Sequence, residues 1–398
     1  MLDLTAARDL VLDECAPLPP ERIGLTEAAG RVLAEDARSA VDLPPFDRSA
    51  MDGFAVRAAD TAPGARLRLA GEIAAGDVPG APLAPGTAAA VTTGAALPDG
   101  ADAVLQVELT RRDGDDVECA SEVAPARHVR FRGEDVRRGD VLARAGEVVT
   151  VQRLSALASA GLGEVFVRRR ARVRVLATGS ELLALGAAPE PGRIHESNRL
   201  VVATMAAGAG AEVVATATVP DDAVATRVAI AAALEDADVL LITGGVSVGA
   251  HDHVKRALDD CGVREVFWRV RLKPGKPLWF GRSASTLVFG LPGNPLSTIA
   301  GVLCFVQPAL NALHGRDEPD PSSQRVRLTG AARADDGRTT LLASTFAPGA
   351  DGVLEATPLP DQGSHLTGGL ARADGFVVVG HDAGLLAAGT LVDAILLG

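Results

Sequence analysis

The chain has 398 residues, of which 47% are hydrophobic and 23% are charged, and its formal net charge is −12 at pH 7. This length exceeds what a single hydrophobic core usually contains, and it predicts roughly two to four domains. The hydrophobic share excludes wholesale disorder. Because an acidic chain has no broad basic field, we expect no nucleic-acid partner.

The N-terminal residues (MLDLTAARDLVLDECA) are acidic and follow a helical pattern, unlike the basic and apolar regions of a signal peptide. The apolar stretches are interrupted by Gly, Pro or charged residues before the ~20 residues of a membrane span. The four cysteines, at positions 15, 119, 261 and 304, are too scattered for a zinc knuckle or a disulfide framework. We therefore expect a cytoplasmic protein with free thiols and no membrane anchor.

The first part of the chain predicts a helix followed by a β-rich region. Apolar residues recur at helical spacing near the N-terminus, at Leu4, Ala7, Leu10, Val11 and Cys15. Residues 46–140 contain short apolar runs separated by Gly, Pro and Asp turns, which is typical of a small β-rich domain. A second helix is predicted within VQRLSALASAGL (151–162).

Residues 172–315 alternate between predicted strands and predicted helices. This alternation predicts an α/β domain with a doubly wound, mostly parallel sheet and helices on both faces. The predicted strands are 172–179, 211–219, 238–245, 264–272 and 285–293, and the predicted helices are 197–210, 221–236, 252–262 and 295–315. A linker rich in Pro and Asp follows, and residues 322–398 are again predicted to be β-rich.

Glycine-containing turns follow predicted strands at 178–182 (TGSEL), 243–249 (TGGVSVG) and 290–295 (GLPGNP). Ligands of parallel sheets bind at the carboxyl ends of the strands, where glycine lets the backbone approach a phosphate closely. Each turn by itself can equally be a tight strand–helix connection, but three in one domain favour an anionic or nucleotide-like ligand. None matches GxGxxG or GxxxxGK[ST], which argues against a Rossmann dinucleotide site and a P-loop.

Acidic residues follow the same predicted strands, at Glu181, Asp221, Asp222 and Asp252. Asp222 is interpreted as a helix N-cap, the common role of an Asp in that position. If the other carboxylates converge, they would suit Mg²⁺, which prefers oxygen ligands. Spacing alone does not show convergence, so the capping and metal-binding interpretations have equal weight here.

Two further segments carry chemistry-bearing residues. In KPGKP (273–277), a Pro-Gly turn is predicted to direct the ammonium groups of Lys273 and Lys276 to the same side. Paired point charges suit a tetrahedral oxyanion, although an isolated KxxK is more often a solvated turn. The segment PPFDRSAMDGFAV (44–56) has neither helical nor strand periodicity, and binding residues concentrate in such loops.

The motifs PPFDRSAMDGFAV, GEIAAGD, TTGAALPDGADAVLQVE, FRGEDVRRGD, ATGSELL, ESN, TGGVSVGAHD, KPGKPLWFG and GLPGNPLS occur in this order. As a set they resemble the molybdopterin molybdenumtransferases, the bacterial MoeA family, which is similar to the E domain of gephyrin. The resemblance covers essentially the whole chain. It implies an elongated domain I (1–45 and 141–171), an inserted β-rich domain II (46–140), an α/β domain III (172–316) and a β-barrel-like domain IV (322–398).

The resemblance also implies an activity and partners. The family inserts molybdate into adenylated molybdopterin in the presence of Mg²⁺ and releases AMP. It forms elongated homodimers whose active site lies between domain III of one subunit and domain II of the other. A contact with the molybdopterin adenylyltransferase, which supplies the substrate, is expected.

Family roles carried over by motif fall on three groups of residues. Asp52, Thr93 and Asp135 are expected on the domain II side of the cleft, and Glu181, Asp221 and Asp252 are expected to hold the metal in domain III. Lys273 and Lys276 are expected to bind molybdate and phosphate. The residues expected to contact substrate are Gly244, Gly245, Ser247, Pro277, Pro292, Gly293, Asn294 and Ser364.

One departure leaves alternatives open. The family usually carries an Arg near Ala343, and this chain has none there. Either Arg338 substitutes for it, or the alignment is shifted by a strand, or this chain handles molybdate less well. A gephyrin-like dimeric scaffold and a tungstate-using enzyme of the same fold are the alternative functions, since tungstate and molybdate have nearly the same size and charge.

Overall fold

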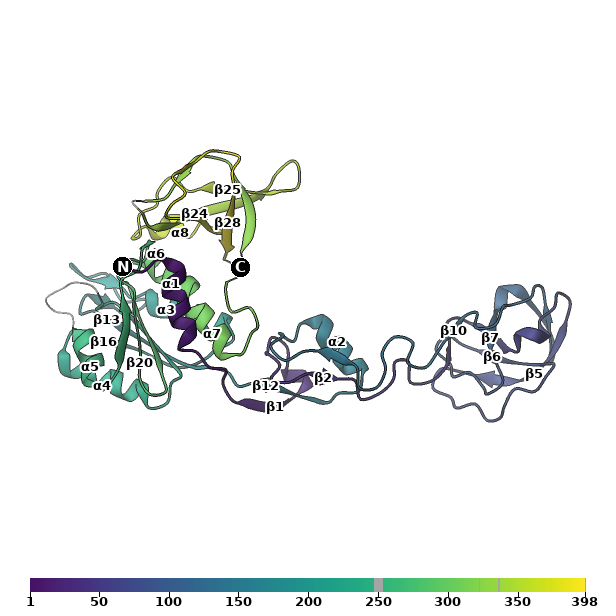
Figure 1. Ribbon diagram of the computed structural model, residues 1–398. Coiled ribbons are helices and arrows are strands. Elements are labelled where there is room, and N and C mark those ends of the chain that lie inside the picture. Colours follow the sequence, from purple (N-terminus) through teal and green to yellow (C-terminus); the bar gives the residue numbers. More distant parts are fainter. Residues whose placement is uncertain (247–252, 322, 336, 398) are drawn as a thin grey trace.

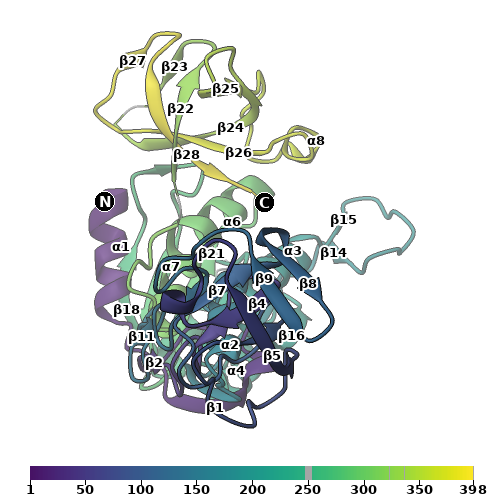
Figure 2. The same ribbon diagram turned by 90° about the vertical axis from the view of Figure 1, so that its right-hand side faces the viewer.

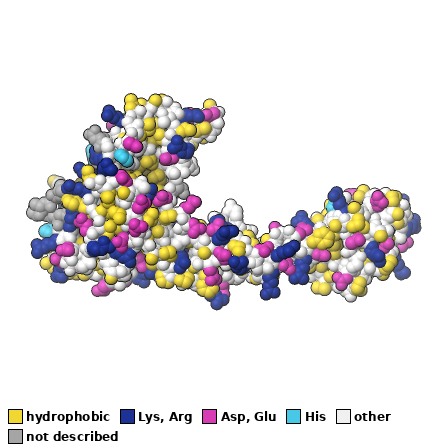
Figure 3. Space-filling model, in the orientation of Figure 1, with side chains coloured by type: hydrophobic (Ala, Val, Ile, Leu, Met, Phe, Trp, Pro, Cys, Tyr) yellow, Lys and Arg dark blue, Asp and Glu magenta, His cyan; other side chains and the backbone are white. Residues whose placement is uncertain are grey.

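The structure is a computed structural model, and it describes residues 1–246, 253–321, 323–335 and 337–397. Figure 1 shows an α/β unit with a β-barrel packed on it at one end of the molecule, and a small β-rich unit at the far end of a thin arm. The face in Figure 3 carries acidic and basic side chains intermixed over all of these units.

The central sheet of the α/β unit has the strand order β16-β13-β17-β21-β20-β18. Its strands are β13 (Arg172–Thr178), β16 (Glu212–Val219), β17 (Val239–Thr243), β18 (Arg264–Trp268), β20 (Trp279–Arg282) and β21 (Leu287–Leu291). The first four strands of this order are parallel, which confirms the predicted mostly parallel sheet, and β20 and β18 form an antiparallel edge. The sequence did not predict β20, because a run of four residues after a turn has no resolvable periodicity.

Helices cover both faces of this sheet, as predicted. On one face, α4 (Ala223–Leu234) and α5 (His253–Asp260) pack in one hydrophobic cluster with the sheet. On the other face lie α3 (Asn198–Gly208), α6 (Pro295–Gly301), the π-helical turn η4 (Val302–Val306) and α7 (Gln307–Leu313). The N-terminal helix α1 (Leu4–Asp13) joins this second cluster through Ala7 and Val11.

The continuous helical stretch Pro295–Leu313 is long and apolar enough to cross a membrane by length and composition. The sequence-based expectation that Gly and Pro interrupt such stretches was therefore wrong for this helix, because both residues are accommodated inside it. Its most apolar window is 89% buried inside the protein, as in the core helix of a folded domain.

The arm is made of two chain passages that run between the α/β unit and the distal unit (Figure 1). In it, β1 (Pro20–Gly24) pairs with β12 (Glu164–Arg168), and β2 (Ala37–Arg38) pairs with β11 (Val141–Ala143). The short turn η1 (Leu25–Glu27) and helix α2 (Val151–Ser159) complete a small hydrophobic cluster of its own.

The distal unit is a six-stranded sheet of order β7-β4-β6-β5-β9-β8. Its elements are β3 (Arg48–Ser49), β4 (Gly53–Val56), η2 (Ala58–Asp60), β5 (Arg66–Ile73), β6 (Thr87–Val91), β7 (Ala103–Gln106), η3 (Val107–Leu109), β8 (Thr110–Asp113), β9 (Asp116–Cys119) and β10 (Val129–Arg130). The observed β-rich unit agrees with the pattern of short apolar runs and turns in this part of the sequence.

The C-terminal unit is a barrel that packs on the α/β unit (Figure 2). Its elements are β22 (Gln324–Leu328), β23 (Ala332–Arg333), β24 (Thr339–Pro348), β25 (Leu354–Pro358), α8 (Thr367–Leu370), β26 (Gly375–Val379), β27 (Leu385–Leu386) and β28 (Leu391–Leu396). The order β24-β25-β22-β28-β26 closes because β24 also pairs with β26. The strand β19 (Leu272–Lys273) lies between β18 and β20 in the sequence but pairs with β24 of the barrel. The segment KPGKP (273–277) therefore begins at the barrel.

Candidate active site

The three glycine turns meet at the carboxyl ends of neighbouring strands. Gly244 has a φ of +84°, and a Cβ added there would lie 2.6 Å from the carbonyl oxygen of Thr178 at the end of β13. A Cβ added at Gly293 would lie 3.9 Å from the Cα of Gly244. The turns that follow β13, β17 and β21 therefore touch one another. Gly245, at a φ of +63°, packs against Val254 of α5, so both glycines are needed for the packing of the turn itself.

Two of the predicted metal-binding acids lie at the ends of neighbouring strands, Glu181 after β13 and Asp221 after β16. The Asp221 carboxylate accepts a hydrogen bond from the Ser180 backbone N–H at 3.0 Å, which ties the end of β16 to the end of β13. The Glu181 carboxylate folds back over Gly179, because a Cβ added at that glycine would lie 2.5 Å from Glu181 Oε2. Asp222 caps α4 by accepting from the Ala225 N–H at 2.8 Å, which confirms its interpretation as an N-cap.

The donor set of Glu181 and Asp221 fits a hydrated Mg²⁺, since both carboxylates are exposed and that ion keeps several of its waters. Among the described residues, no group of three or more His, Cys, Asp or Glu side chains gathers as a metal site. The predicted third ligand, Asp252, and the predicted substrate contact Ser247 both lie outside the described residues. β14 (Leu182–Leu183) and β15 (Ile194–His195) form a short parallel pair that projects from this edge (Figure 2).

A cavity of about 600 Å³ lies between the α/β unit and the barrel. The predicted residues that line it are Lys273, Lys276, Pro277, Pro292, Asn294 and Ser364. Pro292 and Asn294 belong to the turn that touches Gly244, so the cavity is continuous with the strand-end turns. The barrel is fixed there by Asn294, whose Nδ2 donates to Ser364 Oγ at 3.0 Å.

Among the described residues, three cationic side chains line this cavity, Lys273, Lys276 and Arg338, together with His365. The Lys273 ammonium lies 2.9 Å from Asp335 Oδ2, and the Arg338 guanidinium contacts the same oxygen. The hydrogen bond from Lys273, aided by the charge of Arg338, lowers the pKa of Asp335, which keeps this carboxylate ionised. The exposed Lys276 has no ion pair among the described residues. One carboxylate therefore offsets part of three positive charges.

Ala343 does not offer a position for a cationic side chain. Its side chain is 3% exposed and belongs to the core shared with the α/β unit. Its backbone is held by Gln362, which accepts from the Ala343 N–H at 2.9 Å and donates to its carbonyl oxygen at 3.0 Å. Arg338, the residue that could substitute for the missing arginine, lines the cavity.

Sequence reasoning missed two residues that line this cavity, Gln362 and His365, and a third, Asp335, that contacts two of its cationic side chains. Gln362 and His365 lie in the segment that was matched only through Ser364, and Asp335 carries no local signal. Gln362 and His365 could have been found from their proximity to Ser364 in DQGSH. Asp335 could not, because it reaches Lys273 only through the pairing of β19 with β24.

The domain II residues form a separate group on the distal unit. Asp52 Oδ1 accepts from the Thr93 backbone N–H at 2.7 Å and from its hydroxyl at 3.1 Å, so the strand entry into β4 is tied to the turn after β6. Asp52 and Thr93 are both exposed. Asp135 lies where the distal unit joins the arm, and its N–H donates to the Leu43 carbonyl oxygen at 3.1 Å.

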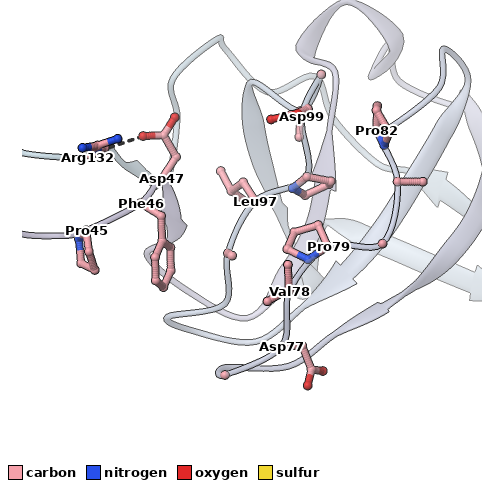
Figure 4. A pocket seen from close by; sticks show the side chains of 17 residues that line it. Pro45, Phe46, Asp47, Asp77, Val78, Pro79, Pro82, Leu97, Asp99 and Arg132 are labelled. Carbon is pink, nitrogen blue, oxygen red and sulfur yellow. Dashed lines mark hydrogen bonds between the residues drawn. The ribbon is translucent and has the colours of Figure 1, made fainter.

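A cavity of about 790 Å³ opens on the distal unit, and sequence reasoning did not predict it. Figure 4 shows Phe46, Leu97, Val78 and Pro79 around it, with Asp47 near Arg132. The Asp47 carboxylate accepts from the Arg132 backbone N–H at 2.8 Å. The loop 44–56 therefore lines a cavity of mixed apolar and charged residues at one end and carries Asp52 further along.

Within one chain, the two groups do not converge. Asp52 and Thr93 lie on the distal unit, whereas Glu181, Asp221 and the lysines lie on the α/β unit at the other end of the arm (Figure 1). The site of one chain thus consists of strand-end turns, carboxylates and a cationic cavity. This fold and this site define a multidomain α/β protein of the kind that binds ligands at its strand-end turns, with a cationic cavity suited to an anion.

Comparisons with known proteins agree with this class. The chain matches the MoeA N-terminal region (domain I and II) over residues 2–161, a probable molybdopterin-binding domain over 174–312, and the MoeA C-terminal region (domain IV) over 325–397. It is 34% identical to a molybdopterin molybdenumtransferase of Haemophilus influenzae, over 98% of each chain. It is 37% identical to molybdopterin molybdenumtransferase 2 of Mycobacterium tuberculosis, over 93% of each chain.

A solved structure, the molybdopterin biosynthesis MoeA protein from Pyrococcus horikoshii OT3, superposes with a TM-score of 0.85. The two chains are 28% identical, and the match covers 100% of each. The chain described here belongs to the molybdopterin molybdenumtransferase family, and it is a transferase of molybdenum cofactor biosynthesis.

Proposed function

We propose that this chain inserts molybdate into adenylated molybdopterin and releases AMP, in a reaction that requires Mg²⁺. The observation that carries this proposal is the continuity of two features. The turn at Pro292–Asn294 touches the strand-end turn at Gly244 and also lines the cavity with Lys273, Lys276 and Arg338. A phosphate-bearing substrate and a separate oxyanion can therefore bind side by side.

Each group has a proposed role in this reaction. Lys276, Lys273 and Arg338 bind and orient the oxyanion, and their charge is available before the substrate arrives. The residues proposed to hold the substrate are Gly244, Gly245, Ser247, Pro277, Pro292, Gly293, Asn294 and Ser364. Glu181, Asp221 and Asp252 would hold Mg²⁺. When bound, that ion supplies charge neutralisation at the pyrophosphate linkage.

We further propose that the site is completed by a second copy of the chain. Asp52, Thr93 and Asp135 are matched to the family's functional positions, yet the arm of their own chain holds Asp52 and Thr93 away from the α/β unit (Figure 1). A homodimer in which the distal unit of one subunit faces the α/β unit of the other would bring these groups together.

The homodimer has a direct test. Sedimentation equilibrium at micromolar concentration is expected to give twice the 40.7 kDa chain mass. A mixture of two impaired variants, Asp52→Ala and Lys276→Ala, is then assayed at a molybdate concentration too low to saturate Lys276→Ala. It is expected to regain part of the activity, because mixed dimers contain one intact site. A monomer of 40.7 kDa as the active species would contradict the shared site.

The activity is tested by incubating the full chain with adenylated molybdopterin, Mg²⁺ and molybdate, and by measuring AMP release. We expect AMP to appear only when molybdate and Mg²⁺ are both present. Measuring AMP release with tungstate in place of molybdate shows which of the two oxyanions the protein uses. A chain that binds the adenylated substrate but releases no AMP under any of these conditions would be the gephyrin-like scaffold instead.

The remaining expectations follow from the same assignment. We propose that the four predicted domain ranges act as the four domains, since each contains a hydrophobic cluster of its own. We also propose a cytoplasmic location. We further propose a contact with the molybdopterin adenylyltransferase, through which that enzyme would transfer the adenylated substrate to this chain.

A further inference from the structure

A second positively charged pocket lies where the arm joins the α/β unit, away from the cavity at the barrel. Its volume is about 260 Å³, and it is lined by Arg31, Arg168, Arg170, Arg316 and His314, among others. Arg31, Arg168 and Arg170 come from the arm and its exit strand, whereas His314 and Arg316 follow α7. The carbonyl end of α3, at Gly208–Gly210, closes the pocket.

The positive charge of this pocket is only partly compensated by the protein. Arg31 donates to Glu21, and Arg168 donates to the Leu18 carbonyl oxygen at 3.1 Å. In the part of the chain that the structure describes, the guanidinium groups of Arg170 and Arg316 have neither a carboxylate nor a carbonyl partner. The end of α3 contributes only a partial negative charge. Burial without a compensating anion lowers the pKa of Arg316.

His314 adds a neutral donor to this group. The ring is 6% exposed, and its Nε2 accepts from the Ala171 N–H at 3.0 Å, so the proton of the neutral ring lies on Nδ1. Nδ1 faces Gly210, where an added Cβ would lie 3.7 Å from it. Burial, together with the charges of Arg316, Arg31 and Arg170, lowers the pKa of His314 to about 4, so the ring stays neutral at pH 7.

Like charges gathered in a partly buried pocket cost stability unless something compensates them, and such local conflicts are typical of functional sites. Guanidinium groups form paired hydrogen bonds with planar or tetrahedral oxyanions. We propose that this pocket binds a tetrahedral dianion of the phosphate class, held by Arg168, Arg170, Arg316 and the Nδ1–H of His314. The anion bridges the arm and the α/β unit, so it stiffens the joint that positions the distal unit.

The proposal is tested by calorimetric titration of the full chain with inorganic phosphate, at constant ionic strength set with sodium chloride. A parallel titration with ribose 5-phosphate decides between the free ion and a phosphate ester as the source. We expect the double variant Arg170→Gln/Arg316→Gln to weaken phosphate binding at this site at least about tenfold. Arg111→Gln, which removes an exposed arginine from the distal unit, is the matched control and is expected to bind as the wild type does.

Phosphate could also bind at the barrel cavity, and Lys276→Ala separates the two sites. This variant removes a cation from the barrel cavity and is expected to leave phosphate binding at the arm pocket unchanged. The Cε1 proton resonance of His314 provides a local readout, and phosphate is expected to shift it in the wild type and in Lys276→Ala. If the double variant unfolds at a lower temperature than the wild type, the single variant Arg170→Gln replaces it in the titration. Arg170 is exposed, so its substitution is expected to affect stability little. Unchanged phosphate affinity in the arginine variants, or a His314 resonance that phosphate does not move, would overturn the proposal.

Discussion

Replacing Asp52 with alanine is expected to lower the rate of AMP release by about a hundredfold or more, which is the range for a positioned acid–base group. Asp52 presents its carboxylate at the exposed entry to β4, where Oδ1 is held by the backbone N–H and the hydroxyl of Thr93. Its second oxygen has no hydrogen-bond partner in the described structure and is available to a ligand bound by the facing subunit of the proposed homodimer.

The stability of the Asp52 variant is expected to change little. The side chain is exposed, and its loss removes hydrogen bonds worth about 0.5–1.5 kcal/mol each. Asp52→Asn keeps an acceptor for Thr93 while removing the charge, so it separates positioning of the loop from the chemistry. Asp113→Ala, an exposed acid on β8, is the matched control. AMP release close to the wild-type rate in Asp52→Ala would show that this loop does not belong to the cleft.

Replacing Lys276 with alanine is expected to raise the half-saturating concentration of molybdate by roughly one to two decades. An ammonium group that contacts a dianion in a partly desolvated cavity contributes about 1.5–3 kcal/mol. Lys273 and Arg338 share the Asp335 carboxylate, so part of their charge is already compensated. Lys276 has no such partner in the described part of the chain and is the cation most available to an incoming anion.

Affinity for the adenylated substrate is expected to change less than affinity for molybdate in Lys276→Ala, since the strand-end turns remain intact. Lys276→Arg keeps the charge and is expected to retain most of the molybdate affinity, and Arg111→Ala is the remote control. A solvated surface lysine would change the free energy of binding by less than about 0.5 kcal/mol. A half-saturating concentration unchanged within about threefold would assign the anion to Lys273 or Arg338 instead.

The sequence by itself determined the local features of this protein. Helical spacing located α1, the alternation of strands and helices located the mostly parallel sheet, and the Asp222 cap marked the start of α4. The order of its motifs identified the family. These signals are readable because periodicity, caps and turns depend on residues within one or two turns of each other along the chain.

The tertiary structure alone decided which distant residues meet. Pairing of β19 with β24 brings Asp335 to Lys273. Gln362 holds the backbone of the buried Ala343 in the core. Arg338 is the arginine that the barrel contributes to the cavity, among the described residues. The arm separates the distal unit, which carries Asp52, from the α/β unit. Where the arm joins the α/β unit, several arginines line one pocket. Contacts of this kind depend on how the chain crosses between units, and no local pattern specifies that path, because residues far apart in the sequence meet only when the whole topology forms.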